Sequence, residues 1–327
     1  MPRLIALDWG TSSQRAWLLG EGGLVLAVRR RAVGLLGAVG DDPTSRTRHY
    51  EAAFDEICGD WLAADPDLPA IACGMVGSSR GWREASYLTV PTDLAIRATD
   101  LTAVSHPRGV VHLVPGVRVA PAADGTVPGD VMRGEETQII GILGLHPPTE
   151  CPLIIVLPGT HSKWTRVENN EIVSFATSLA GEMYGLTLEH GILSRTATAG
   201  VRNDAAFERG LAIGGSVPSR GLLTELFGAR ALVLDGLLDP ASVPDYVSGV
   251  IIADEVRHLL PEYSTEGRIL LCGNADLCRR YAIALHVHGV GTETVAEEAA
   301  AQGLWQVAIT AGLVRSAPHT TPVKEIR

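Results

Sequence analysis

Residues 4–13 read Leu-Ile-Ala-Leu-Asp-Trp-Gly-Thr-Ser-Ser, and residues 153–162 read Leu-Ile-Ile-Val-Leu-Pro-Gly-Thr-His-Ser. Each stretch is a short apolar run that ends in a Gly-Thr turn rich in hydroxyl groups, which is typical of a buried strand bounded by a turn. Both are followed by a second strand-like run, a polar reverse turn and a third strand-like run. Gly10 corresponds to Gly159, 149 residues further along the chain. Two similar three-stranded meanders predict a duplicated pair of domains.

The composition of the chain is that of a globular protein with room for two cores. A length of 327 residues favours two domains, and 46% hydrophobic residues are enough to fill them. The net charge is -10 and no basic stripe is present, which argues against nucleic-acid binding. No apolar run approaches the roughly 20 residues needed to cross a bilayer. A strand-like start at Leu4 argues against a signal peptide, and the five cysteines lack CxxC spacing. We therefore expect a cytoplasmic protein with reduced thiols.

Outside the meanders, strand-like and helical patterns alternate, which indicates the α/β class. Strands are expected at 71–75, 110–119 and 268–272, and helices at 47–64, 132–145, 181–193, 204–215, 218–227, 243–260 and 299–314. Pro147-Pro148, followed by a strand-like run, is typical of a boundary between domains. We accordingly expect one domain at 1–150 and a second at 151–327.

The two Gly-Thr turns have the composition of phosphate-binding turns. Asp8 stands at a strand end beside Gly10, Thr11 and Ser12, so that backbone N–H groups and hydroxyls could bind phosphate while the carboxylate holds Mg²⁺. A hairpin whose Asp caps its own turn explains one such motif about equally well. The second turn, 159–163 (Gly-Thr-His-Ser-Lys), favours phosphate, because two facing turns could clamp a polyphosphate. No Walker A sequence is present.

A pair of carboxylates begins the helix predicted at 132–145. Glu135 and Glu136 could simply complement the helix dipole, which is the usual role of an acid at this place. A kinase that phosphorylates a hydroxyl also needs one carboxylate to accept its proton. Arg133, directly before them, could hold a substrate carboxylate or neutralise developing phosphoryl charge.

Two further polar loops follow apolar strands. Residues 76–83 read Val-Gly-Ser-Ser-Arg-Gly-Trp-Arg, at a place where α/β folds tend to bind ligands. Gly273-Asn274 lies between a predicted strand and a predicted helix and allows close approach of a ring or a phosphate. Gly-Asn is also an ordinary turn sequence, so this second loop is a weaker indication.

The order of these motifs resembles the superfamily of sugar kinases, heat-shock chaperones and actin. Within it, nearly the whole chain, from Ile5 to about Gly312, resembles the 2-dehydro-3-deoxygalactonokinase family. The stretches that carry the likeness are Gly74-Met75-Val76-Gly77-Ser78, Gly81-Trp82, Tyr87-Leu88-Thr89-Val90-Pro91, Met132-Arg133-Gly134-Glu135-Glu136-Thr137-Gln138 and Pro158-Gly159-Thr160-His161-Ser162-Lys163-Trp164. One departure is Cys272-Gly273-Asn274-Ala275, which has a single glycine where related sugar kinases often have two or three.

The resemblance implies a fold, a reaction and cofactors. The fold would be α/β, with two ribonuclease-H-like (actin-like ATPase) domains facing across a nucleotide cleft. The reaction would transfer the γ-phosphoryl group of ATP, with Mg²⁺, to the 6-hydroxyl of 2-dehydro-3-deoxy-D-galactonate, a small sugar acid of galactonate breakdown. The galacto and gluco epimers of this acid are not distinguished. The oligomeric state is left open, with a homodimer as one option.

The resemblance also implies roles for individual residues. Glu135 matches the catalytic carboxylate, with Glu136 as the alternative, and Asp8 would order Mg²⁺. The phosphates would be held by Gly10, Thr11, Ser12, Gly159, Thr160 and His161, and adenosine by Gly273 and Asn274. The sugar acid would be held by Gly77, Ser78, Ser79, Trp82 and Arg133. Arg80, Arg83 and Lys163 compete with Arg133 for the substrate carboxylate.

Three other functions are alternatives to a kinase for this sugar acid. A kinase of the same fold could act on another sugar acid or polyol, since pocket residues set that choice. An ATPase module of the actin or chaperone type would need a large partner-binding insert, and the sequence has none. An α/β hydrolase would need a GxSxG elbow, which is missing.

Overall fold

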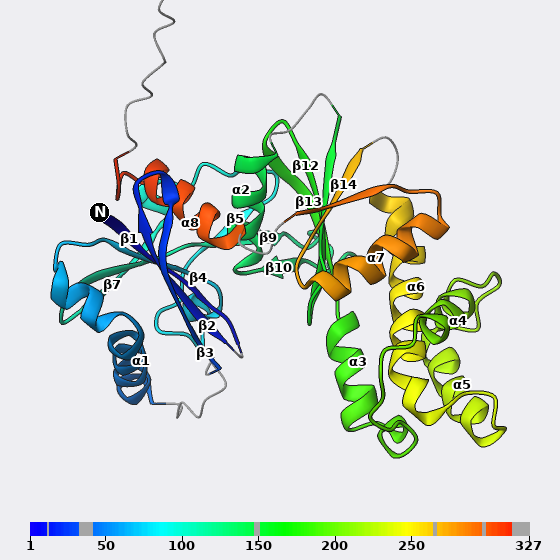
Figure 1. The fold of residues 1–327 in the computed structure, drawn as a ribbon. Coiled ribbons are helices and arrows are strands. Elements are labelled where there is room, and N and C mark those ends of the chain that lie inside the picture. Colours follow the sequence, from blue (N-terminus) through cyan, green and yellow to red (C-terminus); the bar gives the residue numbers. More distant parts are fainter. Residues whose placement is uncertain (12, 33–41, 147–150, 264–266, 296–298, 316–327) are drawn as a thin grey trace, which may run out of the picture. The chain divides into compact units, whose positions relative to one another are not determined.

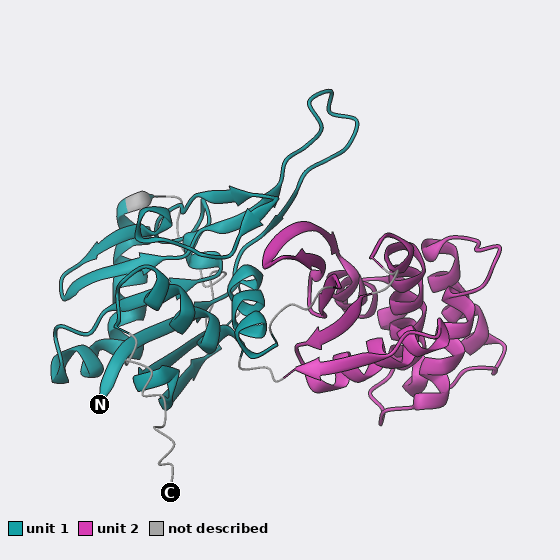
Figure 2. Cartoon of the chain, turned by 90° about the horizontal axis from the view of Figure 1, so that it is seen from above, with its two compact units in different colours: residues 1–147, 298–327 teal, residues 148–297 magenta. Residues whose placement is uncertain are grey.

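The computed structural model describes residues 1–11, 13–32, 42–146, 151–263, 267–295 and 299–315. The chain forms two compact units (Figure 2). Unit 1 comprises Met1–Pro147 and Glu298–Arg327, and unit 2 comprises Pro148–Glu297. Within the described ranges, every helix is too short or too polar to cross a membrane.

The main sheet of unit 1 has the strand order β3-β2-β1-β4-β8-β7. Its strands are β1 (Pro2–Trp9), β2 (Gln14–Gly20), β3 (Val25–Arg31), β4 (Ala70–Cys73), β7 (Thr102–His106) and β8 (Gly109–Leu113). The first three form an antiparallel meander, while β4 runs parallel to β1 and β8 parallel to β4. Leu4 to Leu7 are fully buried at the centre of the sheet, as their unbroken apolar run predicts.

A smaller sheet of unit 1 has the order β10-β9-β5. It consists of β5 (Tyr87–Thr89), β9 (Gly116–Val119) and β10 (Asp130–Met132), and the short strand β6 (Thr92–Asp93) follows β5 in the chain. The prediction of a single strand at 110–119 is wrong, because β8 and β9 belong to different sheets. Pro115 lies between them and has no N–H group to continue a ladder, which accounts for the break.

Unit 2 repeats this topology in the order β15-β14-β11-β12-β13. Its strands are β11 (Leu153–Leu157), β12 (Ser162–Glu168), β13 (Glu171–Ser178), β14 (Arg268–Cys272) and β15 (Thr292–Val295). Again the first three form an antiparallel meander, and β14 and β15 add to it in parallel (Figure 1). The expected duplicated meander and the α/β class are therefore confirmed.

The helices of unit 1 are α1 (Pro43–Ala64), α2 (Glu135–Leu145) and α8 (Ala299–Thr310) in the described ranges. Helix α1 packs Phe54, Ile57 and Trp61 into the same core as Ile5 and Leu7 of β1. The helical spacing of its apolar residues predicts this packing.

Helix α8 lies in unit 1 and packs against α2, whereas the sequence placed residues 299–314 in a second domain that runs to the end of the chain. Glycines permit an unusually close crossing. A Cβ atom at Gly141 would lie 1.9 Å from the carbonyl oxygen of Ala299, and one at Gly303 would lie 1.8 Å from that of Thr137. The helices could not approach as closely with any larger residue at either glycine.

The helices of unit 2 are α3 (Ala180–Glu189), α4 (Asp204–Gly214), α5 (Leu222–Leu234), α6 (Val243–Tyr263) and α7 (Ala275–Val287) in its described part. Helices α4 and α5 both pack against the long helix α6 (Figure 1). Helix α5 begins later than the expected 218–227, because Gly221 has a φ of +88°, outside the helical region.

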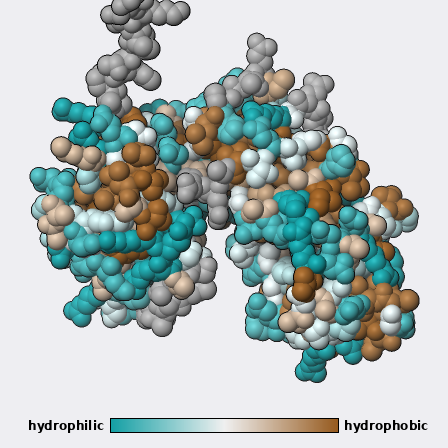
Figure 3. Space-filling model, in the orientation of Figure 1, coloured by the Kyte–Doolittle hydropathy of each residue, from teal (hydrophilic) through white to brown (hydrophobic). Residues whose placement is uncertain are grey.

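One face of α5 exposes apolar side chains, including Leu223 (74% exposed), Phe227 (59%) and Leu234 (72%). Figure 3 shows hydrophobic surface at the lower right, where this helix lies.

Candidate active site

One group of candidate residues lies in unit 1, where glycines bring three chain segments together. Asp8 is near the end of β1, Gly74 follows β4, and Gly134 precedes α2. A Cβ atom at Gly134 would lie 3.2 Å from Cα of Gly74, and one at Gly74 would lie 2.8 Å from the carbonyl oxygen of Trp9 and 3.3 Å from Oδ1 of Asp8. These close approaches place the carboxylate of Asp8 beside the start of the helix that carries Glu135.

The environment of Asp8 disfavours its charged form. Burial raises the pKa of Asp8 to about 6; Arg15, its partner on β2, lowers the pKa, and Glu135 raises it again. Cys73 Sγ lies 4.0 Å from Asp8 Oδ1. Among the described residues, no three His, Cys, Asp or Glu side chains converge into a metal site. A cation beside Asp8 would therefore take most of its ligands from phosphates and water, which is the usual arrangement for Mg²⁺.

The two carboxylates at the start of α2 have different surroundings. Glu136 is fully buried, and it accepts hydrogen bonds from the Gly134 N–H group (2.6 Å) and from Thr137 Oγ1 (2.9 Å). Glu135 is partly exposed, and its Oε2 accepts a hydrogen bond from the Arg133 N–H group (2.9 Å). Glu136 thus serves the helix start, while Glu135 can be reached by a ligand.

Glu136→Gln is expected to stabilise the protein at alkaline pH. Burial, followed by repulsion from Glu135, raises the pKa of Glu136 from the ordinary 4.5 to about 7. The folded state therefore binds this proton more tightly than the unfolded state does. Stability is highest below the unfolded pKa and is lost as the pH rises through the folded pKa, by about 3 kcal/mol in all. Glutamine cannot ionise, so the variant escapes this loss.

Thermal unfolding of wild type and Glu136→Gln at about pH 8 and about pH 4 measures the effect. A higher Tm for the variant at the alkaline pH, with little difference at the acidic pH, is expected. Equal pH dependence of the two proteins would contradict it.

Beside this helix start, the side chain of Arg133 is buried. Its side chain lies over the ring of Tyr87, with Cζ 4.2 Å from the ring centroid, and its Nη2 donates to the carbonyl oxygen of Ala85 (2.9 Å). Within the described residues, nothing accepts a hydrogen bond from Nε or Nη1 of Arg133, and the buried Ser78 Oγ and Trp82 Nε1 are likewise without partners. Buried polar groups are normally hydrogen-bonded, so the unpartnered N–H groups of Arg133 favour a polar ligand at this residue.

Another group of candidate residues lies in unit 2, around the turn between β11 and β12. Thr160 and His161 are exposed there, and the start of α3 packs against the turn. The Glu182 N–H group donates to the carbonyl oxygen of Thr160 (2.9 Å), and Nε2 of His161 lies 2.6 Å from Oε2 of Glu182. A Cβ atom at Gly181 would lie 2.3 Å from the carbonyl oxygen of Gly159. The positive end of a helix dipole thus lies next to the turn, an arrangement that favours anions.

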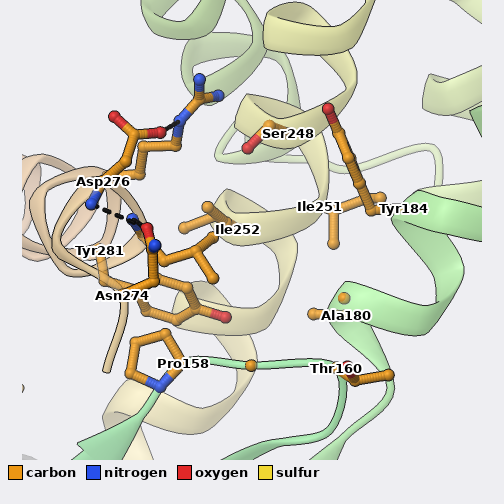
Figure 4. A pocket seen from close by; sticks show the side chains of 14 residues that line it. Pro158, Thr160, Ala180, Tyr184, Ser248, Ile251, Ile252, Asn274, Asp276 and Tyr281 are labelled. Carbon is orange, nitrogen blue, oxygen red and sulfur yellow. Dashed lines mark hydrogen bonds and ion pairs between the residues drawn. The ribbon is translucent and has the colours of Figure 1, made fainter. Parts of the chain in front are cut away.

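A pocket of about 480 Å³ opens beside this turn, between it and helices α3, α6 and α7 (Figure 4). Its volume is in the range of small-molecule sites. Asn274 caps α7 at the pocket edge, with Oδ1 accepting from the N–H groups of Asp276 (3.0 Å) and Leu277 (3.3 Å). A Cβ atom at Gly273 would lie 2.9 Å from the carbonyl oxygen of Pro158, so glycine allows the two turns of unit 2 to meet.

Comparisons with known proteins identify the family of this chain. A sequence model of the 2-keto-3-deoxy-galactonokinase family matches residues 8–307. The chain belongs to this family. It is 32% identical over 300 residues to the 2-dehydro-3-deoxygalactonokinase of Escherichia coli (strain K12), covering 92% of this chain and 95% of the relative.

Three further comparisons support the family assignment or the fold. A protein of Rhizobium meliloti (strain 1021) named as a probable 2-dehydro-3-deoxygalactonokinase is 34% identical over 312 residues, which cover 91% of this chain and 94% of that protein. A crystal structure from Sinorhizobium meliloti, of a candidate 2-dehydro-3-deoxygalactonokinase, superposes with a TM-score of 0.81 at 32% identity, over 94% of this chain and 98% of that one. The (R)-2-hydroxyglutaryl-CoA dehydratase component A of Acidaminococcus fermentans, at 12% identity and a TM-score of 0.50 over 94% and 96% of the two chains, shares the fold alone.

In this member of the 2-keto-3-deoxy-galactonokinase family, the expected site residues form two groups. Unit 1 contains those expected at its strand ends and helix start, namely Asp8, Gly10, Thr11, Gly77, Ser78, Trp82, Arg133, Glu135 and Glu136. Unit 2 contains Gly159, Thr160, His161, Gly273 and Asn274. Ser12 lies outside the described residues.

The four cations considered for the substrate carboxylate are separated by their exposure. Arg80 and Arg83 are exposed, as is Ser79, whereas Arg133 is buried. Lys163 is buried in unit 2, where its Nζ donates to the carbonyl oxygen of His161 (3.3 Å). Arg133 therefore combines burial with unused N–H groups.

Sequence reasoning missed most of the wall of the 480 Å³ pocket. Ser248 and Ile252 are four residues apart on α6, and Leu277 and Tyr281 are four residues apart on α7, so each pair faces the same way. Such spacing also describes residues of a helix core. The sequence alone therefore gave no signal that separates a pocket wall from packing.

Proposed function

We propose that this chain transfers the γ-phosphoryl group of ATP to the 6-hydroxyl of 2-dehydro-3-deoxy-D-galactonate. Membership of a kinase family named for this sugar acid supports the reaction. The single observation that favours an acidic acceptor is the buried guanidinium of Arg133, whose Nε and Nη1 have no hydrogen-bond partner among the described residues. We infer that the enzyme acts in the cytoplasm, where ATP is available.

The sugar acid binds in unit 1 on this proposal. Arg133 pairs with its carboxylate through Nη1, because a charge-assisted hydrogen bond from a guanidinium to a carboxylate is strong. Ser78 Oγ and Trp82 Nε1 bond its oxygens, and Gly77 leaves room for Arg133, since a Cβ atom there would lie 3.1 Å from Nη1. Specificity then follows from leaving these buried groups unpaired when the acceptor lacks matching oxygens.

Glu135 acts as the general base. It accepts the proton of the attacking 6-hydroxyl, and its partial exposure allows direct contact with the acceptor. Its Oε2 is held by the Arg133 N–H group (2.9 Å), which keeps the carboxylate close to the residue that orients the sugar acid. Glu136, buried beneath it, holds the helix start.

The nucleotide is bound by both Gly-Thr turns and the pocket of unit 2. Gly10, Thr11 and Ser12 on one turn and Gly159, Thr160 and His161 on the other contact the phosphates, helped by the start of α3. Adenosine occupies the 480 Å³ pocket with Gly273 and Asn274 at its edge. Asp8 would hold Mg²⁺, which neutralises phosphate charge when bound.

A coupled ADP-release assay with ATP and Mg²⁺ tests the proposal. The acceptors are 2-dehydro-3-deoxygalactonate, its gluco epimer, galactonate, glycerol and none. Highest kcat/KM with the first compound is expected. Preference for another acceptor would retain a kinase and discard this substrate. Acceptor-independent ADP release, or no release at all, would contradict the proposal.

A further inference from the structure

The stretch 158–164 (Pro-Gly-Thr-His-Ser-Lys-Trp) contains two residues that the proposed reaction does not use. Ser162 and Trp164 are fully buried on β12, and both face Glu255 of α6. Ser162 Oγ lies 2.8 Å from each carboxylate oxygen of Glu255, and Trp164 Nε1 donates to Oε1 at 2.8 Å. The end of this stretch is thus hydrogen-bonded to helix α6.

The same carboxylate holds a residue of the nucleotide pocket. The hydroxyl of Tyr281 on α7 donates to Oε1 of Glu255 at 2.9 Å. Tyr281 also lines the 480 Å³ pocket, into which Figure 4 shows its ring directed. Glu255 therefore connects β12, which continues the phosphate turn, with α7, which forms the pocket wall.

Glu255 is the acceptor in each of these hydrogen bonds. Its side chain is 6% exposed, and its hydrogen-bond partners are neutral donors. An ionised carboxylate can only accept hydrogen bonds, so all three donor groups must point at it. Burial of a charge is unfavourable unless such bonds satisfy it, which ties the three groups to one arrangement.

We propose that Glu255 is a positioning residue for nucleotide binding, which acts through Ser162 on the second phosphate turn and through Tyr281 on the pocket wall. The proposal rests on the proposed function only in taking the pocket of unit 2 as the ATP site. A purely structural role would lower stability without selecting between the two substrates. A positioning role affects the nucleotide and leaves the sugar acid unchanged.

The test compares two substitutions at one site. Glu255→Met has similar length and accepts no strong hydrogen bond, so it leaves three buried donors without a partner. Glu255→Gln keeps a carbonyl oxygen where Trp164 and Tyr281 donate, and its amide can donate to Ser162 Oγ if that hydroxyl rotates. We expect Glu255→Met to raise KM for ATP and Kd for ADP by about tenfold or more, and Glu255→Gln to restore both to within about threefold of wild type.

Glu225 supplies the matched control. It is also a glutamate that is 6% exposed in unit 2, and it accepts hydrogen bonds from Ser219 Oγ (2.7 Å) and the Arg220 N–H group (3.1 Å). Neither Glu225 nor those two partners line the nucleotide pocket. Glu225→Met is expected to lower the Tm and leave KM for ATP unchanged, whereas KM for the sugar acid is unchanged in every variant.

Ser162→Ala and Tyr281→Phe keep the test valid if Glu255→Met does not fold. Each removes one donor and is expected to weaken ADP binding a few-fold, measured by titration calorimetry. Unchanged ADP affinity in both, or a Glu255→Gln variant as weak as Glu255→Met, would overturn the positioning role. Failure of wild type to bind ADP would instead overturn the proposed function, and the two failures are thereby distinguished.

Discussion

Glu135→Gln is expected to lower kcat with 2-dehydro-3-deoxygalactonate by about 10²–10⁴-fold, the usual contribution of one general base. Glutamine preserves the size of the side chain and can still accept the hydrogen bond from the Arg133 N–H group, now 2.9 Å from Oε2. It cannot take up the proton of the acceptor hydroxyl. Steady-state kinetics with saturating ATP measures the loss, and the Kd for ADP is expected to stay unchanged.

Glu136→Gln is the matched control in the same assay. This side chain is fully buried and bonded to Gly134 and Thr137, so its kcat is expected to stay within about tenfold of wild type. A large loss for Glu136→Gln with normal turnover of Glu135→Gln would move the base by one position. A loss below about tenfold in both would remove the base from this helix start.

Arg133→Met is expected to lower kcat/KM for the sugar acid by about 10²–10⁴-fold. Two hydrogen bonds to a charged group, each worth about 1.5–3 kcal/mol, are lost, and about 1.4 kcal/mol corresponds to a factor of ten. Methionine retains apolar contact with the ring of Tyr87, over which the guanidinium lies. The effect should appear mainly in KM for the acid, with KM for ATP nearly unchanged.

Two further variants separate charge from geometry. Arg133→Lys keeps the charge and loses the planar fork of donors, so an intermediate effect is expected. Arg83→Met removes an exposed arginine from the neighbouring loop and is expected to have no effect on KM. A normal KM in Arg133→Met, or an increase in Arg83→Met, would assign the carboxylate to another cation.

The meander strands of both units, with β4 and β14, could be predicted because each is a strand-like run ended by a turn signal, whereas β5, β6, β7, β10 and β15 were not predicted. β11 and β14 in particular follow unbroken apolar runs, which only burial on both faces explains. The division of the chain could not be predicted in full. The alanine-rich pattern at 299–314 shows that a helix has an apolar face, but the pattern does not specify which sheet or helix covers that face.

The candidate site shows the same limit. The residues of the turns and of the α2 start were found because glycines, hydroxyls and carboxylates are uncommon together at strand ends. The choice of Arg133 over Arg80 and Arg83 required burial and hydrogen-bond partners, which depend on contacts distant in sequence. Glu255 shows this most clearly, since it bonds to Ser162, 93 residues earlier in the chain.

The packing of α8 on α2 orders events during synthesis. The 150 residues of unit 2, Pro148–Glu297, leave the ribosome between these two helices. Helix α2, which carries Glu135, can therefore pack against α8 only after all of unit 2 has been made. A chain interrupted within unit 2 would contain Asp8, Arg133 and Glu135 and still lack the support of Gly303 against Thr137. The helix that carries Glu135 is thus fully packed only after α8 has been made.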